Sequence, residues 1–446
     1  MSSQAERRNI CISPEDEEVL KLHVSTSPDR TYLALEKEAN FKNLEGFNLC
    51  TINEDGIQII NHLFSGKTLG ETLPVLISEN HRTPPIKIRQ QVFTFLHRLY
   101  ARSLIQISDE AGEIKVPNWA MEPLTDVHLF ITHKCNLDCI HCLIVSEKRK
   151  ELTAQEFMGV VDDLVQLGCT DLDITGGEIT TKRGFLDLID HATSKNLSVG
   201  VGTNGTSWSN EELERLINLK PEKVNISIYS ADSGVHDQIT QRPGSFDRSV
   251  SLASRLIQAG IPVNFKCMIM RANFNSFETV ARLAKTLGAG YQFDAHITSK
   301  TDGNPSPLAK RLSDHQLWKF VRSPWCTPAK EKMVTADTIV CNAGVDRVSI
   351  NAYGDVHPCA VFPIKVGNVG ENRLPEIWEN SPLLNEIRIF RFRDFGKCGF
   401  CPLLTRCSPC PGASYLEQGN FRETPDWSCK LTKMIIEAQR EGVRKR

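Results

Sequence analysis

The sequence lacks any long hydrophobic run. Apolar residues make up 40% of its 446 residues, yet no stretch approaches the ~18 consecutive apolar residues that a membrane helix needs. Residues 1–9 are polar and no apolar stretch follows them, which argues against a secretory signal. We therefore expect no membrane partner and a cytoplasmic location.

Net charge is also nearly absent. Lys and Arg number 52 and Asp and Glu 54, so the formal net charge is −2. Surfaces that bind nucleic acid or anionic lipid are usually basic. The balance therefore argues against a general nucleic-acid or membrane surface. Internal repeats and low-complexity tracts are absent too.

The middle of the chain, residues 122–298, alternates apolar strand-like runs with amphipathic helical segments. Thr153 and Glu156 predict a capping box at the start of the first such helix. Six strand–helix repeats indicate parallel strands, in an open sheet or a partial barrel, and hence an α/β fold. The expected strands are 127–131, 172–174, 197–201, 224–228, 263–270 and 291–297.

The two flanking regions differ from the middle one. In residues 1–115, short strand-like runs at 32–35 and 47–49 precede apolar residues at helical spacing, which predicts a small winged-helix-like module. Residues 326–446 are irregular and rich in cysteine. We expect such a segment to bury little apolar surface and to need bound metal for its shape.

Fifteen cysteines are many for a chain with no secretory signal, and a disulfide framework is improbable there. Cys135, Cys139 and Cys142 form a C-x3-C-x2-C triplet just after the first predicted strand of the middle region. Three thiolates on one loop can hold three corners of a [4Fe–4S] cluster and leave one iron open. The alternative is a zinc site with His141 as fourth ligand, although zinc usually takes two separated pairs.

The triplet resembles the signature of the radical S-adenosylmethionine superfamily, which has a partial (β/α)6 barrel and carries its cluster after the first strand. Gly176-Gly177-Glu178 stands where the family has its GGE motif, with Ile179 in place of the usual proline. The resemblance implies that S-adenosylmethionine binds the open iron and yields a 5′-deoxyadenosyl radical. It also implies an electron donor such as flavodoxin or ferredoxin. The implied cofactor contacts are Gly176, Gly177, Glu178, Thr203, Asn204 and Ser227. In this reading Glu178 accepts from the methionine ammonium and the glycines expose backbone polar groups to the ligand.

The C-terminal cysteines resemble an SPASM domain, which carries two auxiliary [4Fe–4S] clusters. By that resemblance the first cluster is held by Cys341, Cys359 and Cys410, and the second by Cys398, Cys401, Cys407 and Cys429. The fourth ligand of the first cluster stays open, with Cys326, His357 or a substrate thiolate as candidates. The x2 spacing before Cys410 departs from the common x3. A zinc ribbon of Cys398, Cys401, Cys407 and Cys410 is the alternative.

Residues 25–110 resemble the recognition domain of enzymes that modify ribosomal peptides. Such a domain takes a leader peptide as an added strand. Residues 80–108 contain five Lys or Arg and no acidic residue, which suits an acidic leader, although a solvated helix face would look the same.

We therefore predict a maturase that forms a thioether or carbon–carbon crosslink in a precursor peptide. A sulfatase-maturase-like dehydrogenase is an alternative, but those enzymes have an acidic residue where Ala360 follows Cys359 here. A non-enzymatic iron–sulfur sensor with a DNA-binding winged helix is another. Residues 1–110 contain more acidic than basic residues, which opposes it.

Overall fold

The computed structural model describes residues 24–27, 30–33, 74–78, 88, 124–326, 329, 331–332 and 334–444. The chain divides into two units, Met1–Pro123 and Leu124–Arg446. In the first, β1 (Val24–Ser27) pairs antiparallel with β2 (Arg30–Leu33), and residues 74–78 are helical. The strand β2 overlaps the predicted run at 32–35. The other elements expected of a winged-helix-like module lie outside the described residues.

The second unit is built on one nine-stranded sheet. Six of its strands run parallel in chain order, each followed by helix, as the strand–helix repeats predict. They are β3 (Asp126–Phe130), β4 (Asp171–Thr175), β5 (Ser198–Thr203), β6 (Lys223–Ser227), β7 (Val263–Met268) and β8 (Gly290–Asp294). The predicted α/β fold with a parallel sheet is confirmed.

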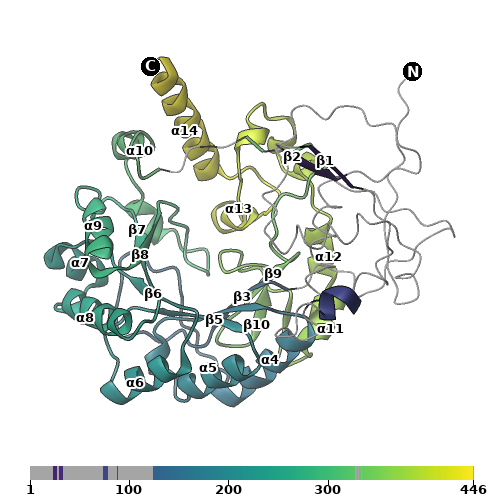
Figure 1. Cartoon of the computed structure of the whole chain (residues 1–446). Coiled ribbons are helices and arrows are strands. Elements are labelled where there is room, and N and C mark those ends of the chain that lie inside the picture. Colours follow the sequence, from purple (N-terminus) through teal and green to yellow (C-terminus); the bar gives the residue numbers. More distant parts are fainter. Residues whose placement is uncertain are drawn as a thin grey trace. The chain divides into compact units, whose positions relative to one another are not determined.

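Helices cover the outer face of these strands (Figure 1). They are α4 (Ala154–Gln166), α5 (Phe185–Ser194), α6 (Asn210–Leu219), α7 (Ser233–Thr240), α8 (Ser245–Gln258) and α9 (Glu278–Leu287), and α10 (Asp314–Val321) follows β8. The predicted capping box begins α4, since Thr153 Oγ1 accepts from the Glu156 N–H and the Glu156 carboxylate accepts from the Thr153 N–H. In β3, Val127 and Leu129 are fully buried and the alternate side chains are half-buried. The sheet therefore has an apolar outer face and a more polar inner face.

The C-terminal segment extends the same sheet. The strand β9 (Arg347–Ile350) pairs parallel with β3, and β10 (Asp355–His357) and β11 (Gly367–Asn368) follow antiparallel. The remaining helices are α11 (Leu374–Asn380), α12 (Pro382–Arg388), α13 (Pro411–Gln418) and α14 (Asp426–Arg444). Short 3-10 turns are η3 (Ile179–Thr181), η4 (Ser306–Lys310), η5 (Phe392–Asp394), η6 (Cys398–Phe400) and η7 (Leu404–Arg406).

The expectation that this segment buries little apolar surface is wrong. Phe362, Phe390, Phe395 and Phe421 are buried together in a core of its own. These aromatic residues come from separate turns with no regular spacing, so periodicity could not group them. Among the described residues, no helix is long and apolar enough to cross a membrane.

Candidate active site

The cysteine triplet lies on the loop that follows β3, beside the turn that ends β4. The Gly177 N–H donates to the Thr132 carbonyl at 2.8 Å, and the Glu178 N–H donates to the Lys134 carbonyl at 2.8 Å. A Cβ on Gly177 would lie 2.3 Å from the Lys134 oxygen, so only glycine permits this approach. The Gly177 and Glu178 N–H groups are bonded within the chain and fix the turn against the triplet loop. That the two glycines also expose backbone polar groups to a ligand stays a prediction.

The Glu178 carboxylate is fully buried at the end of β4. Its Oε1 accepts from Thr203 Oγ1 and its Oε2 from the Asn204 N–H, both at 2.7 Å. Burial raises the pKa of Glu178, and these hydrogen bonds oppose that shift. The Thr203 hydroxyl also accepts from the Gly205 N–H and the Trp208 Nε1–H, each at 3.0 Å. The only proton of that hydroxyl therefore goes to Glu178.

Asn204 links the end of β5 to the triplet. Its Nδ2 donates to Asn136 Oδ1 at 2.8 Å and lies 3.7 Å from Cys135 Sγ. The sequence analysis predicted three cofactor contacts at the ends of two neighbouring strands. These residues form one hydrogen-bonded group next to the first triplet cysteine: Glu178, Thr203 and Asn204.

Tyr229 is a residue of this site that the sequence reasoning missed. It follows β6 and is buried, and its hydroxyl lies next to the side chains of Ser227 and Cys139. The His141 ring lies edge-on to it, with centroids 4.8 Å apart. Ser227 therefore sits beside the triplet through Tyr229. The one signal in the sequence was its place two residues beyond Ser227, at a strand end.

Glu151, also missed, anchors the start of the triplet loop. It accepts from the His133 N–H at 2.8 Å and from Thr132 Oγ1. Lys182 Nζ lies 3.3 Å away, and both side chains of this pair are largely buried. These contacts outweigh burial and lower the pKa of Glu151. A buried ion pair thus holds the loop before the first cysteine.

The C-terminal thiols gather in two groups. Burial, with smaller contributions from the nearby thiols of Cys341 and Cys410, raises the pKa of Cys359 to about 11. Burial likewise raises the pKa of Cys398 to about 11, and its thiol neighbours are Cys401, Cys407 and Cys429. These are the two sets that the SPASM resemblance implies, although their role as ligands stays a prediction.

The donor atoms fit iron–sulfur clusters. Cys135, Cys341 and Cys410 each have a sulfur that accepts a backbone N–H at 3.4 Å, which favours the thiolate that ligates iron. Burial acts the other way and raises the pKa of Cys139 to about 12, so a bound cation is needed to deprotonate it. Among the described residues, no three His, Cys, Asp or Glu side chains surround a single-ion site. In a cluster, the thiolates bind different iron atoms.

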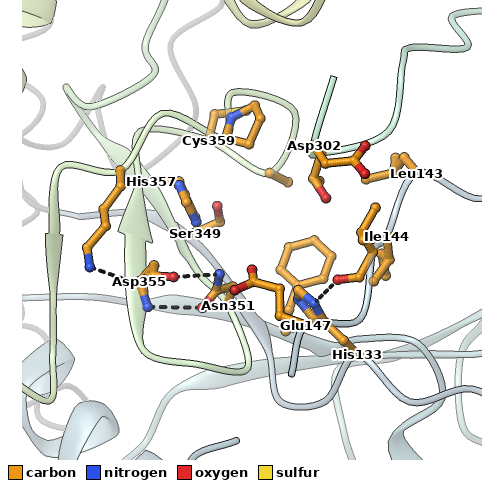
Figure 2. Close-up of a pocket in the computed structure, with 16 residues that line it drawn as sticks. His133, Leu143, Ile144, Glu147, Asp302, Ser349, Asn351, Asp355, His357 and Cys359 are labelled. Atoms are coloured by element: carbon orange, nitrogen blue, oxygen red, sulfur yellow. Dashed lines mark hydrogen bonds and ion pairs between the residues drawn. The ribbon is translucent and has the colours of Figure 1, made fainter. Parts of the chain in front are cut away.

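A cavity of about 280 Å³ lies between the triplet loop and the β9–β10 hairpin (Figure 2). His133 and Glu147 reach it from the loop, and His357 and Cys359 from the C-terminal segment. It is therefore a candidate substrate cavity, with residues near the triplet on one wall and a cysteine of the first C-terminal group on another.

Two family descriptions match the chain. Residues 129–284 match the radical SAM superfamily, and residues 341–411 match an iron–sulfur cluster-binding domain, SPASM. The first match spans the triplet and the parallel strands from β3 to β7, and it ends within α9. The second includes Cys341, Cys359 and the four cysteines from Cys398 to Cys410.

Curated relatives match at modest identity. An AdoMet-dependent heme synthase of Methanosarcina barkeri is 26% identical, over 66% of this chain and 93% of its own length. The mycofactocin maturase MftC of Mycobacterium tuberculosis is 29% identical, over 67% and 81%. The subtilosin biosynthesis protein AlbA of Bacillus subtilis is 25% identical, over 87% and 90%.

Solved structures share the fold. Streptococcus suis SuiB bound to its precursor peptide SuiA matches with a TM-score of 0.56 and 15% identity, over 83% of this chain and 92% of that one. The enzyme anSMEcpe with bound AdoMet matches with a TM-score of 0.53 and 15% identity, over 72% and 94%. At this identity the solved structures show the fold alone. The two domain matches, with the cysteine triplet that the first one contains, show that the chain is a radical S-adenosylmethionine enzyme with an SPASM domain, and that its cofactors are [4Fe–4S] clusters and S-adenosylmethionine.

Proposed function

We propose that this enzyme matures a ribosomally made precursor peptide by joining two of its residues through a thioether or a carbon–carbon bond. The observation that carries the proposal is the grouping of the SPASM thiols near a candidate substrate cavity, in an enzyme whose relatives include peptide maturases. MftC is named a maturase, AlbA acts in subtilosin biosynthesis, and SuiB was solved with its precursor peptide.

We assign recognition of the leader peptide to residues 1–115. The AlbA match covers 87% of the chain, whereas residues 124–446 make up less than three quarters of it. The AlbA match must therefore include part of the first unit. The matches of the heme synthase and of MftC are short enough to lie entirely within the second unit. An added-strand mode of binding suits a module that begins with an antiparallel hairpin.

We assign the radical chemistry to residues 122–298 and the auxiliary clusters to residues 326–446. The cluster and S-adenosylmethionine supply a 5′-deoxyadenosyl radical when bound. Cys135, Cys139 and Cys142 would hold the cluster, and Glu178 would accept from the cofactor's ammonium. The buried Thr203 and Asn204 donors orient that carboxylate before the cofactor arrives.

The remaining contacts follow from the same geometry. Gly176 and Gly177 set the turn that aims Glu178, and Ser227 would reach the ribose side beside Tyr229. An external protein of the flavodoxin or ferredoxin type would supply electrons. No disulfide joins the described cysteines, which suits a reducing cytoplasm.

The test is a search beside the gene for an open reading frame that encodes a small cysteine-containing peptide, followed by co-expression of that peptide with the enzyme. A crosslink removes two hydrogen atoms from the peptide: the 5′-deoxyadenosyl radical would take one and become 5′-deoxyadenosine, and the other would leave as a proton and an electron, for which a bound auxiliary cluster would be the acceptor. We expect a mass loss of two hydrogens per bond and a matching amount of 5′-deoxyadenosine. Cys169→Ala, which removes a buried thiol outside all three sets, is the control and should retain both products.

Tandem mass spectrometry distinguishes the alternative. A sulfatase-maturase-like dehydrogenase also removes two hydrogens, but it leaves an oxidised residue that an aldehyde reagent traps, whereas a crosslink links two fragments. Trapping by the aldehyde reagent, or a peptide that stays unmodified while S-adenosylmethionine is cleaved, would contradict the proposal.

A further inference from the structure

We propose that Phe400 and the basic residues around it form a docking surface for a small acidic electron-transfer protein of the flavodoxin or ferredoxin class. The inference rests on the proposed function and deepens it, because it says where the external electron-transfer protein binds. Three observations carry it: an apolar side chain held in solvent between two thiols, a surplus of positive charge on the same segment, and the small size of the patch.

Phe400 is the most exposed large apolar side chain among the described residues, at 89%. It lies between Cys398 and Cys401 on the 3-10 turn η6. The same segment buries three other phenylalanine side chains in its core: Phe390, Phe392 and Phe395. An apolar core is therefore close at hand, and Phe400 stays outside it.

The backbone fixes the direction of this side chain. The Cys398 N–H donates to the Phe395 carbonyl at 2.8 Å, and the Cys401 N–H donates to the Cys398 carbonyl at 3.0 Å. A Cβ on Gly399 would lie 2.7 Å from the Arg393 Cα, so the turn packs tightly against η5. A turn that is already fixed loses little conformational freedom when a partner covers it.

The segment that carries Phe400 has a surplus of positive charge. Residues 388–407 contain five basic residues and one acidic residue. Two other segments, residues 331–337 and 422–440, form hydrogen bonds with it. They contain five basic and five acidic residues in total, so they leave the surplus in place.

Ion pairs narrow this surplus without removing it. Among the described residues, two ion pairs bring an acid from outside the three segments to one of their cations. Arg422 binds Glu386 at 2.8 Å, and Lys430 binds Asp314 at 2.5 Å. Basic residues still outnumber acids when these two acids are included, so the surface around η6 is positive.

Lys397 is the cation placed best to act with Phe400. It directly precedes η6 in a helical conformation, and residues three apart lie on the same side of a 3-10 helix. Lys397 is exposed and forms no ion pair with the described residues. An acidic partner that covers Phe400 would therefore meet an unpaired ammonium group beside it.

The small size of the patch favours an electron-transfer partner over a permanent subunit. Electron-transfer proteins form brief complexes with interfaces below about 1,200 Å², whereas permanent partners bury larger apolar surfaces. One aromatic anchor and a basic surround suit such an encounter, because the charges steer the partner and the anchor holds it.

The position of Phe400 suits that partner too. In the proposed function, formation of the crosslink releases one electron. That electron would pass from a cluster held by the second thiol group to the oxidised partner, which becomes reduced. No bond forms or breaks in the encounter. Phe400 lies on the turn between two cysteines of that group, Cys398 and Cys401, so a partner docked there covers the thiols that would hold the cluster.

The test is calorimetric binding of two acidic probes, an oxidised bacterial flavodoxin and an oxidised bacterial ferredoxin, to the reconstituted full-length enzyme. We expect at least one probe to bind, and more weakly as salt is added. Phe400→Ser should weaken binding at least about tenfold, because aromatic anchors dominate such interfaces. Lys397→Gln should weaken it about threefold and flatten the salt dependence. Lys285→Gln, which changes an exposed lysine of α9, is the matched control and should keep the wild-type affinity.

Iron content and melting temperature distinguish a lost surface from a damaged enzyme. Both should stay at wild-type values in Phe400→Ser, because the side chain lies almost wholly in solvent. Phe400→Leu keeps an apolar side chain and should retain most of the affinity, so it tests the surface even if the serine variant loses iron.

Wild-type affinity in Phe400→Ser, or no binding of either probe, would overturn the inference. Equally tight binding of a basic cytochrome c or of single-stranded DNA would also overturn it. Binding that appears only after residues 1–110 are removed would assign the patch to the first unit of this chain, and the inference would fail.

These outcomes are separable from that of the proposed function. If the enzyme crosslinks its precursor but Phe400→Ser binds the probes normally, the docking surface fails and the function stands. If binding depends on Phe400 but no precursor is modified, the function fails and the docking surface stands.

Discussion

Replacing Glu178 by glutamine should destabilise the enzyme even though the two side chains have nearly the same shape. Both carboxylate oxygens of Glu178 accept from donors that cannot turn around. One is the Asn204 backbone N–H, and the other is the Thr203 hydroxyl, whose lone pairs already accept two other N–H groups. At one of these two positions, the amide nitrogen of glutamine would lie against another hydrogen-bond donor. The site is fully buried, so no water can relieve that conflict.

The magnitude follows from that conflict. An unsatisfied buried polar group costs about 1–3 kcal/mol, and the charged hydrogen bond that is lost contributes in the same range. We expect a fall in melting temperature on the order of 2–8 °C. Thr203→Val should also destabilise, by removing the donor. The double variant should be less destabilised than the two single effects predict together, since residues in direct contact couple by about 0.5–3 kcal/mol.

The assay is a thermal melt of the four proteins, followed by the affinity for S-adenosylmethionine against pH. Because burial raises the pKa of Glu178, its carboxylate takes up a proton at a higher pH than an ordinary glutamate. The contribution of this group to folding is therefore largest below its unfolded pKa and falls as the pH rises. The affinity for S-adenosylmethionine should depend on pH in the opposite direction, because it should fall as acid protonates Glu178. A wild-type melt for Glu178→Gln, additive effects in the double variant, or the same pH profile in wild type and Glu178→Gln would refute the reasoning.

Three further predictions address the other parts of the site. Changing Cys135, Cys139 and Cys142 together to alanine should abolish formation of 5′-deoxyadenosine and leave auxiliary iron, measured by chromatography and iron analysis; undiminished product would exclude the triplet as the cluster site. Removing residues 1–110 should leave cleavage of S-adenosylmethionine largely intact but sharply reduce peptide modification, because leader docking raises the local concentration of the substrate; modification of the full precursor at the normal rate would exclude leader recognition by this segment. If the first auxiliary cluster has an open iron, a cysteine-containing precursor should perturb its spectrum and the Cys→Ala precursor should not; loss of that cluster in Cys326→Ala would show a fourth protein ligand instead.

The parallel sheet could be predicted because its strands alternate with helices and have an apolar face that repeats every second residue. The strand end at β8 was less accurate: the predicted run reached residue 297, but β8 ends at Asp294. Ala295 and Ile297 are buried nonetheless. The apolar pattern at these positions therefore indicates buried side chains and not strand pairing. The pairing of β9 with β3 could not be predicted, because Arg347–Ile350 is short and lies far from β3 in the sequence.

In the candidate site, sequence spacing located the residues that act locally and missed those that act through tertiary contact. The triplet and the Gly176–Glu178 turn are short motifs with fixed offsets. Tyr229 and Glu151 carry no motif, and only the fold brings them to the triplet loop. The glycines illustrate the same limit. Sequence reasoning predicted close approach of a ligand, and it did not predict the close contact of Gly176 and Gly177 with the triplet loop.

The split of two neighbouring cysteines shows how the C-terminal segment is assembled. Cys407 and Cys410 are separated by two residues, yet Cys407 lies with Cys401 and Cys429, and Cys410 lies with Cys341. The helix α13 explains the turn between them. It begins directly after Cys410, and a Cβ on Gly412 would lie 2.4 Å from the Val361 oxygen, so the helix start packs tightly against the chain that follows Cys359.

Cys407, in contrast, contacts Thr432 on α14, the helix that carries Cys429. The short x2 spacing is therefore compatible with two separate sets, since the chain turns between them at the start of α13. The aromatic core of Phe362, Phe390, Phe395 and Phe421 packs against both Cys359 and Cys398. The two thiol groups are therefore joined by residues 407–410 and built on the same packed core.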